Sequence, residues 1–357
     1  MTDAVRSTIV VVLLLVSAAG LAVGTGTAGA QSNAVDCSYP MTVEDATGTQ
    51  VTVPSEPQRV VVLAPSAAQT MWAIGAKEKV VGMPVNQYTA YLDGSKEKKN
   101  VMTSTGEPQA ETIVAQHPDL VLAPNLIRNK TVNNLREKGL TVYRFDAARN
   151  LEDVYEKTNR TGCLVGNDER ARQVSAEMRS EVHSIERSVA DEPRPDVYYV
   201  MAGGFTAGPG SFVHEIITTA GGHNIAADAN ITFYEKISPE IIERENPDYI
   251  VVNQNVDLPD NAAVQNSTAV RKDQVIRVNQ NYMNQPGPKN VIAIRQLAEA
   301  FHSNENTTTT TDATTTTATT TTTATPGPTT TAGGPGFGVA VAVLALAVAV
   351  GLLGRHD

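Results

Sequence analysis

The sequence has few of the residues that build metal centres. It holds two cysteines and six histidines among 357 residues, and no histidine has another histidine two or four positions further along. A zinc or manganese site needs several converging histidines and carboxylates. The sequence therefore predicts no metal site and no cofactor.

The motifs of common enzymes are also missing. Ser66 follows a predicted strand, but it lacks the Gly-x-Ser-x-Gly elbow and has no evident histidine partner. The glycines between Gly203 and Gly210 form neither Gly-x-Gly-x-x-Gly nor a P-loop, and we interpret this stretch as a flexible rim. We therefore expect no enzyme activity. The formal net charge of −10 argues against nucleic acid as a partner.

The two ends of the chain predict export and anchoring. Residues 1–30 have the parts of a secretory signal: Arg6, the apolar run Ile9–Val16 and the small residues Ala28–Ala30. An uncleaved membrane anchor is the alternative, but the apolar run is short. In an exported chain, the pair Cys37 and Cys163 suggests one disulfide, with two free buried thiols as the alternative. Asn-x-Thr sequons permit glycosylation and begin at Asn129, Asn159, Asn230, Asn266 and Asn306.

A low-complexity stalk precedes the C-terminus. Residues 307–331 contain 18 threonines, a composition that cannot bury a core and is typical of an O-glycosylated rod. Pro335-Gly336-Phe337, seventeen uncharged residues (338–354) and Arg355 follow. This order of parts resembles the archaeal PGF-CTERM sorting signal, in which the tail is removed and replaced by lipid. A plain C-terminal membrane helix is the alternative. Both predict tethering to the outer face of the cell membrane.

A long amphipathic helix is predicted over Asp168–Ala190. Its apolar residues recur at steps of three or four, which is the period of one helix face. Asn167 and Asp168 are expected to cap its start, and Pro193 prevents it from continuing. The stripe consists of Ala171, Val174, Met178, Val182, Ile185 and Val189.

Strand and helix alternate on both sides of this helix, which predicts parallel sheets covered by helices. The two sides share a spacing: Ile113 stands five residues before Pro118-Asp119, and Ile242 stands five before Pro247-Asp248. This repeat favours two similar α/β lobes joined by one strut. The predicted organisation is a signal peptide (1–30), an N-terminal lobe (37–166), a bridging helix (167–192), a C-terminal lobe (193–303), a stalk (304–334) and a sorting segment (335–357).

Several stretches resemble the substrate-binding proteins of ABC importers for cobalamin, iron-siderophores and haem. They are Asp45–Gly48, Arg59–Ser66, Pro118–Leu122, Ala220–Ile225 and Pro247–Val251. The resemblance implies two Rossmann-like lobes joined by a long helix, with the ligand cleft between them. It also implies a monomer that delivers its ligand to an ABC permease and ATPase. The family usually docks on the permease through a carboxylate on each lobe. Here Glu215 is the matching carboxylate of the C-terminal lobe, but Gln69 stands in the matching place of the N-terminal lobe, where Glu78 or Glu97 is the alternative.

Ligands of parallel sheets bind beyond the carboxyl ends of the strands. The segments expected there hold amides and aromatic rings and no Lys or Arg, with Arg128 as the main exception. A wide neutral cleft suits a corrinoid, whose macrocycle and amide groups match such side chains, better than an anionic ferric siderophore or haem, which remain the alternatives. A surface protein without a transport role is a further alternative. The predicted ligand-binding residues are Ser66, Gln69, Asn86, Gln87, Tyr88, Asn125, Phe205, Tyr234, Asn253 and Tyr282.

Overall fold

The computed structural model describes residues 37–303. The predicted signal peptide, the stalk and the sorting segment lie outside the described residues. Within the described range, none of the helices combines the length and the apolar character needed to cross a membrane.

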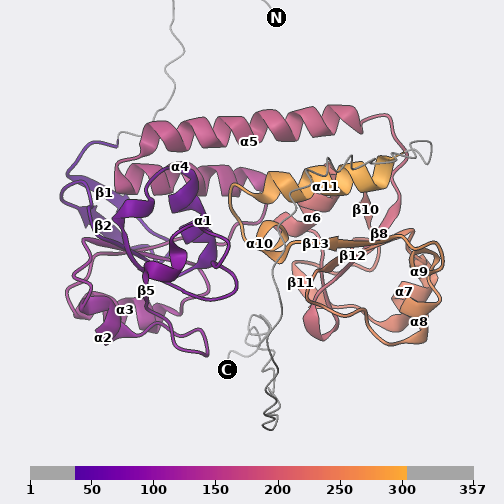
Figure 1. The fold of residues 1–357 in the computed structure, drawn as a ribbon, viewed down its shortest axis with the longest axis horizontal. Helices are drawn as coiled ribbons and strands as arrows, with labels where there is room; N and C mark the ends of the chain where they lie inside the picture. The colour runs from indigo at the N-terminus through magenta and orange to yellow at the C-terminus, as the bar shows by residue number, and fades with distance from the viewer. Residues whose placement is uncertain (1–36, 304–357) are drawn as a thin grey trace, which may run out of the picture. The chain divides into compact units, whose positions relative to one another are not determined.

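Two parallel sheets form the framework of residues 37–303 (Figure 1). The N-terminal lobe contains five parallel strands in the order β5-β4-β3-β6-β7, and the C-terminal lobe contains four in the order β10-β8-β12-β13. Two antiparallel pairs, β1-β2 and β9-β11, accompany them. The predicted fold class, with helix-flanked parallel sheets in two lobes, is confirmed.

The N-terminal lobe is built from β1 (Met41–Glu44), β2 (Gln50–Val53), β3 (Val60–Val62), α1 (Pro65–Ala73), β4 (Val80–Met83), β5 (Lys99–Asn100), α2 (Ala110–Val114), β6 (Leu120–Ala123), α3 (Asn129–Glu137) and β7 (Val142–Arg144). Short 3-10 turns lie at Lys77–Lys79 and Ser95–Glu97. The central strands β3 and β6 are buried at every position, because helices cover both faces of the sheet.

The C-terminal lobe is built from β8 (Asp196–Val200), a 3-10 turn (Ala202–Gly204), β9 (Phe205–Ala207), α6 (Phe212–Thr219), β10 (His223–Asn224), β11 (Tyr234–Lys236), α7 (Pro239–Glu245), β12 (Tyr249–Asn253), α8 (Ala262–Gln265), α9 (Thr268–Arg271), β13 (Val275–Val278), α10 (Gln280–Met283) and α11 (Asn290–His302). The glycine-rich stretch was wrongly interpreted as a flexible rim. β9 pairs with β11, and a Cβ on Gly208 would lie 2.0 Å from the carbonyl oxygen of Ile231. That glycine permits two backbone segments to touch.

The long helix α5 (Asp168–Ser188) confirms the predicted strut, and the whole predicted stripe is buried, including Val189 just beyond the end of the helix. A second helix takes part in joining the lobes. This helix, α4 (Leu151–Val165), lies beside α5 (Figure 1), and the two are joined only by Gly166 and Asn167. A Cβ on Gly162 of α4 would lie 2.2 Å from the Cβ of Ala171, so this glycine brings the two helices into close contact. The predicted Asn167 cap is wrong, because its side-chain amide donates to the carbonyl of Ile74 instead.

The strut contacts both lobes. α4 packs against α1 of the N-terminal lobe, and α5 packs against α11 of the C-terminal lobe, where Arg295 and Glu181 form an ion pair at 2.5 Å. The predicted disulfide is present in the structure and joins Cys37 to Cys163 of α4. The backbone carbonyl of Cys163 also accepts a hydrogen bond from the Tyr39 hydroxyl at 3.0 Å.

The internal repeat has a structural basis. The carboxylate of Asp119 accepts hydrogen bonds from the backbone amides of Gln58 and Arg59, just before β3. The carboxylate of Asp248 likewise accepts from the amide of Asp196, which begins β8. In both lobes the repeated aspartate therefore aligns the start of the neighbouring strand. The residue before each repeated proline, His117 or Asn246, has φ near +45° (46° and 44°), so both repeats share the same turn.

Asp45 anchors the β1–β2 hairpin to the N-terminal sheet. Its carboxylate, fully shielded from solvent, accepts hydrogen bonds from Thr47 and from the amide of Arg144, and it pairs with the guanidinium of Arg136. Burial alone would raise the pKa of Asp45, but these hydrogen bonds and the Arg136 charge together hold it below its usual value.

Asp45→Asn is expected to lower the free energy of unfolding by about 2 kcal/mol at pH 7, because it removes the charge opposite Arg136. The carboxylate has a lowered pKa in the folded state. Its stabilising effect is therefore complete above about pH 4 and is lost as the pH falls through the folded-state pKa. Urea unfolding of both proteins between pH 7 and pH 2 checks this. The two curves should converge in acid; a constant difference would contradict the assignment.

Candidate functional site

The predicted ligand residues lie at or beyond the carboxyl ends of the parallel strands. In the N-terminal lobe the predicted residues follow β3, β4 and β6. In the C-terminal lobe some follow β8 and β13, and Asn253 is the last residue of β12. Tyr234 lies on β11, which pairs with β9. The topology therefore places them on the expected edge of each sheet. Their exposure divides them into two groups.

Three of the ten predicted residues are internal. Ser66, Gln69 and Asn253 are 6%, 1% and 4% exposed. The other seven keep contact with solvent: Asn86 and Gln87 are exposed, whereas Tyr88, Asn125, Phe205, Tyr234 and Tyr282 are partly buried. The second group supplies the candidates for direct contact with a ligand, and the first holds the framework in place.

Gln69 connects the two lobes. Its side-chain amide nitrogen lies 2.8 Å from the Tyr91 hydroxyl and 3.1 Å from the backbone carbonyl of Asn281, and its oxygen accepts from the amide of Lys289 at 2.9 Å. Gln285 extends the cluster by donating to the carbonyl of Tyr88 at 2.9 Å. We call these six residues the interlobe amide cluster. It fastens the segment after β13 to α1 and to the loop after β4.

An aromatic pair lies beside this cluster. The rings of Tyr91 and Tyr282 meet edge to face with centroids 6.1 Å apart. The ammonium group of Lys289 lies 5.5 Å from the Tyr91 centroid and 5.3 Å from that of Tyr282, within cation–π range. Burial raises the pKa of Tyr91 to about 12, so its hydroxyl stays neutral. The contact therefore couples one aromatic residue of each lobe to a lysine.

The prediction of a rim without lysine is wrong. Besides Lys289, Lys236 lies 5.6 Å from the ring centroid of Phe205, and Lys157 lies 5.4 Å from that of Phe145. The local sequence did not reveal these lysines, because each lysine and the ring it covers lie on different elements. For example, Lys236 is on β11 and Phe205 is on the paired strand β9. The rim is aromatic and amide-rich as predicted, but it also carries positive charge.

Asn253 has a structural partner in the C-terminal lobe. The hydroxyl of the fully buried Tyr199 lies 2.5 Å from the side-chain oxygen of Asn284 and 3.3 Å from that of Asn253. Burial raises the pKa of Tyr199 well above its ordinary value, so the hydroxyl remains a neutral donor. Sequence reasoning missed Tyr199, which sits within a continuous apolar strand and looks like ordinary core. This arrangement orients the ends of β12 and of α10.

The two residues considered for permease docking are engaged inside the chain. Gln69 belongs to the interlobe amide cluster. Glu215, on α6, is partly buried and its carboxylate accepts a hydrogen bond from the backbone amide of Leu151 at the start of α4. Burial, followed by nearby acidic side chains, raises the pKa of Glu215, while the Leu151 hydrogen bond opposes the rise. Gln69 is 1% exposed, which argues against it as a docking residue, whereas Glu215 keeps partial contact with solvent and its docking role stays a prediction.

Two exposed apolar side chains lie at the rim. Leu126, in the loop after β6, is 57% exposed, and Phe233, directly before β11, is 40% exposed. Phe233 also has φ +56°, a conformation that costs a bulky residue about 1 kcal/mol or more. Backbone hydrogen bonds to Gly208 and Pro209 hold it there. The strained conformation and the exposed ring make Phe233 a candidate ligand contact that sequence reasoning missed. Leu126 directly follows the predicted residue Asn125.

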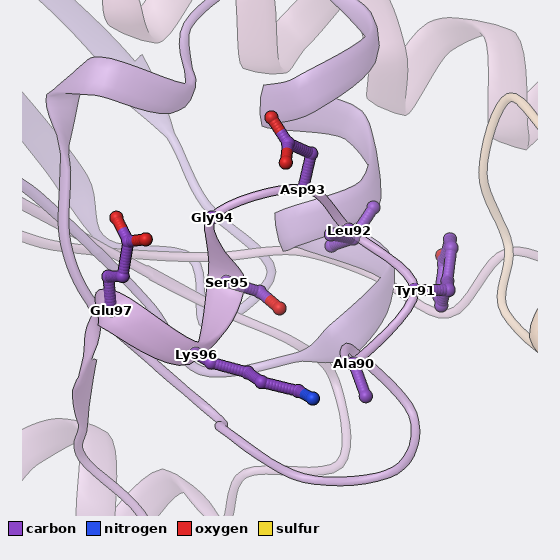
Figure 2. Close-up of a pocket in the computed structure, with 8 residues that line it drawn as sticks. All are labelled: Ala90, Tyr91, Leu92, Asp93, Gly94, Ser95, Lys96 and Glu97. Carbon is purple, nitrogen blue, oxygen red and sulfur yellow. The ribbon is translucent and has the colours of Figure 1, made fainter. Parts of the chain in front are cut away.

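A hollow lies within the loop that carries Tyr91. It has a volume of about 390 Å³ and is lined by residues Ala90–Glu97 (Figure 2). Figure 2 shows the side chains of Ser95 and Lys96 turned to the inside of the loop. The hydroxyl of Ser95 is buried and has no hydrogen-bond partner.

Among residues 37–303, no cluster of three or more His, Cys, Asp or Glu side chains could hold a metal ion.

A family model described as periplasmic binding protein matches residues 60–282, more than half of the chain. The chain belongs to the periplasmic binding protein family. A relative in this family, the cobalamin-binding protein of Halobacterium salinarum, is 44% identical over 282 residues, which cover 75% of each chain. The vitamin B12-binding protein of Salmonella choleraesuis is 25% identical and covers 68% of this chain and 89% of its own.

Solved structures of periplasmic binding proteins share the fold. The vitamin B12-binding protein BtuF of Vibrio cholerae aligns with a TM-score of 0.58 and 23% identity, covering 69% of this chain and 96% of its own. The haem-binding protein RhuT of Roseiflexus aligns with a TM-score of 0.61 and 22% identity, covering 69% of this chain and 98% of its own. At this level of identity the likeness establishes the fold and leaves the ligand open.

Proposed function

We propose that this periplasmic binding protein captures a corrinoid between its two lobes and delivers it to an ABC import permease. The observation that carries the proposal is the 44% identity to a cobalamin-binding protein over three quarters of both chains. The rim supports it, since aromatic rings can lie against a macrocycle and side-chain amides can bond its amide groups. A carrier releases its ligand unchanged, which fits the absence of an evident nucleophile–histidine pair in the sequence.

Isothermal titration of the purified protein with cyanocobalamin, haem and a ferric hydroxamate tests the ligand. We expect saturable binding of cyanocobalamin and at least tenfold weaker binding of the other two. Binding of haem or the ferric hydroxamate with no heat from any corrinoid would overturn the corrinoid assignment and favour the alternative ligand class. Haem is the stronger alternative because the basic rim can meet its carboxylates.

Phe233→Ala and Leu126→Ala are each expected to weaken cyanocobalamin binding about tenfold, because each removes apolar area that the ligand would cover. Neither should change the unfolding temperature much, since both side chains are exposed in the free protein. Ile292→Ala is the matched control: Ile292 is 43% exposed but lies on α11, which packs on α5. Equal affinities for all three variants would show that the two rim residues do not touch the ligand.

The location is part of the same proposal. The signal sequence predicts export, and the threonine-rich stalk with the segment at 335–357 supports tethering to the outer face of the membrane. Three sequon asparagines, at 129, 230 and 266, are exposed and suited to glycosylation. Asn159 lies within α4 with its side-chain oxygen buried, so we expect it to stay unmodified. Membrane fractionation before and after removal of residues 335–357 tests the anchor.

A further inference from the structure

Lys157 is a buried cation without an anionic partner. Its side chain, on α4, is 9% exposed and makes no ion pair or side-chain hydrogen bond with any other described residue. The ammonium group lies over the Phe145 ring, 5.4 Å from the centroid. Burial lowers the pKa of Lys157 to about 8, so the group is still mostly protonated at neutral pH. A buried charge is ordinarily paired, because desolvation is costly.

The position of Lys157 places this charge near the junction of the lobes. The backbone amide of Leu151, the first residue of α4, donates a hydrogen bond to the carboxylate of Glu215 in the C-terminal lobe. Lys157 lies six residues further on, about 9 Å along the helix axis. The ammonium group lies over the Phe145 ring, so the side chain reaches from α4 to the end of the N-terminal sheet. Its ring partner, Phe145, directly follows β7 at the ligand edge of the sheet.

Two further lysines support a positive site. Lys236 covers Phe205, and Lys289 covers Tyr91 and Tyr282. Like Lys157, neither has a carboxylate within 4.0 Å in the described part of the chain, whereas Lys77, Lys79 and Lys138 do. Lysines without a carboxylate partner thus lie over aromatic rings of both lobes, as Lys98 does over Trp72.

We propose that Lys157 receives an anionic oxygen group of the captured ligand, a phosphodiester or a carboxylate. The inference rests on the proposed function of ligand capture and refines it. If the ligand is a corrinoid, the group is the phosphodiester of the cobalamin nucleotide loop, which cobinamide lacks. An ion pair formed on binding stabilises the complex, because the lysine side chain is already nine-tenths shielded from solvent in the free protein. If the ligand is haem, its carboxylates take the same place.

The first test needs no identified ligand. Lys157→Met keeps the length of the stem and removes the charge, so the free variant should unfold at a higher temperature than the wild type. Inorganic phosphate, compared with chloride at equal ionic strength, should raise the unfolding temperature of the wild type by roughly 2–4 °C at tenfold its Kd. It should not do so for the variant. Lys272→Met, at an exposed lysine, should respond as the wild type does. An equal response to phosphate in all three proteins would overturn the proposal.

The second test compares two corrinoids. Lys157→Met should bind cyanocobalamin at least tenfold more weakly than the wild type and should bind dicyanocobinamide as well as the wild type does. Equal weakening for both corrinoids would overturn the anion assignment while leaving corrinoid capture intact. Wild-type protein that binds neither corrinoid would overturn the proposed ligand, and the phosphate experiment would still decide the role of Lys157.

Discussion

Replacing both Cys37 and Cys163 by alanine is expected to lower the free energy of unfolding by about 4–5 kcal/mol. The bridge closes a loop with a sequence separation of 126 residues, and the loss of chain entropy in the unfolded state grows with loop length. The loop contains the whole N-terminal sheet. The bridge therefore restrains the unfolded form of an entire lobe.

Denaturant unfolding of the double alanine variant, compared with the oxidised wild type, measures this effect. Wild type treated with a reductant is the control, and it should unfold at nearly the same denaturant concentration as the variant. Ligand affinity should be unchanged, since Cys163 lies about 18 Å along α4 from Leu151 at the lobe junction. A loss below about 1 kcal/mol would mean that other contacts near the start of the described chain, such as that of Tyr39 with Cys163, suffice to hold it.

Gln69→Ala is expected to cost about 3–5 kcal/mol of unfolding free energy. The substitution leaves a cavity at a site that is 1% exposed, and it leaves the Tyr91 hydroxyl, the Asn281 carbonyl and the Lys289 amide with a partner missing. The backbone also comes close at this point, because a Cβ on Gly287 would lie 2.7 Å from the Gln69 oxygen. Because Gly287 presents only backbone at this point, it has no side chain that could fill the cavity.

A second substitution distinguishes packing from hydrogen bonding. Gln69→Met keeps most of the volume and removes the amide, so its loss of stability should approach that of alanine if the interlobe hydrogen bonds dominate. Gln265→Ala, at an exposed glutamine whose amide bonds the Pro259 carbonyl, is the matched control and should change the unfolding free energy by less than about 0.5 kcal/mol. Hydrogen exchange of the Lys289 amide gives a local readout. If this amide stays as protected in Gln69→Ala as in the wild type, the cluster does not join the lobes.

Mutation of Gln69 should also affect capture. The cluster fixes the loop after β4 to the segment after β13, and both loops carry predicted ligand residues. If the lobes are free to separate, the arrangement competent for binding is populated for less of the time, and the apparent affinity falls by the same factor. Titration of Gln69→Ala with cyanocobalamin measures that loss. The disulfide variant, which is destabilised without a change at the junction, shows how much of it is due to stability alone.

Local patterns determined much of the architecture. The three-four stripe from Ala171 to Ile185 predicted α5, because only one face of a helix has that period. Short apolar runs closed by glycine and proline predicted the parallel strands, and the repeated Pro-Asp unit predicted two related lobes. α4 was not predicted, although Leu151, Val154, Tyr155 and Val165 recur at helical spacing, because Lys157, Thr158 and Thr161 occupy the buried positions between them.

The role of each rim residue depended on the tertiary structure. The sequence correctly placed Gln69, Asn253 and Tyr282 at or beyond strand ends. Only the tertiary structure shows that Gln69 and Asn253 are buried and stabilise the framework. The lysines near the aromatic rings could not be foreseen, because a cation–π contact is formed by residues distant in sequence or on paired strands. The chain by itself therefore determined the order of its strands and helices and the edge at which they can bind a ligand. Packing of the lobes against one another decided which side chains at that edge are buried, paired or left free, because solvent exposure and charge pairing arise only when distant segments meet.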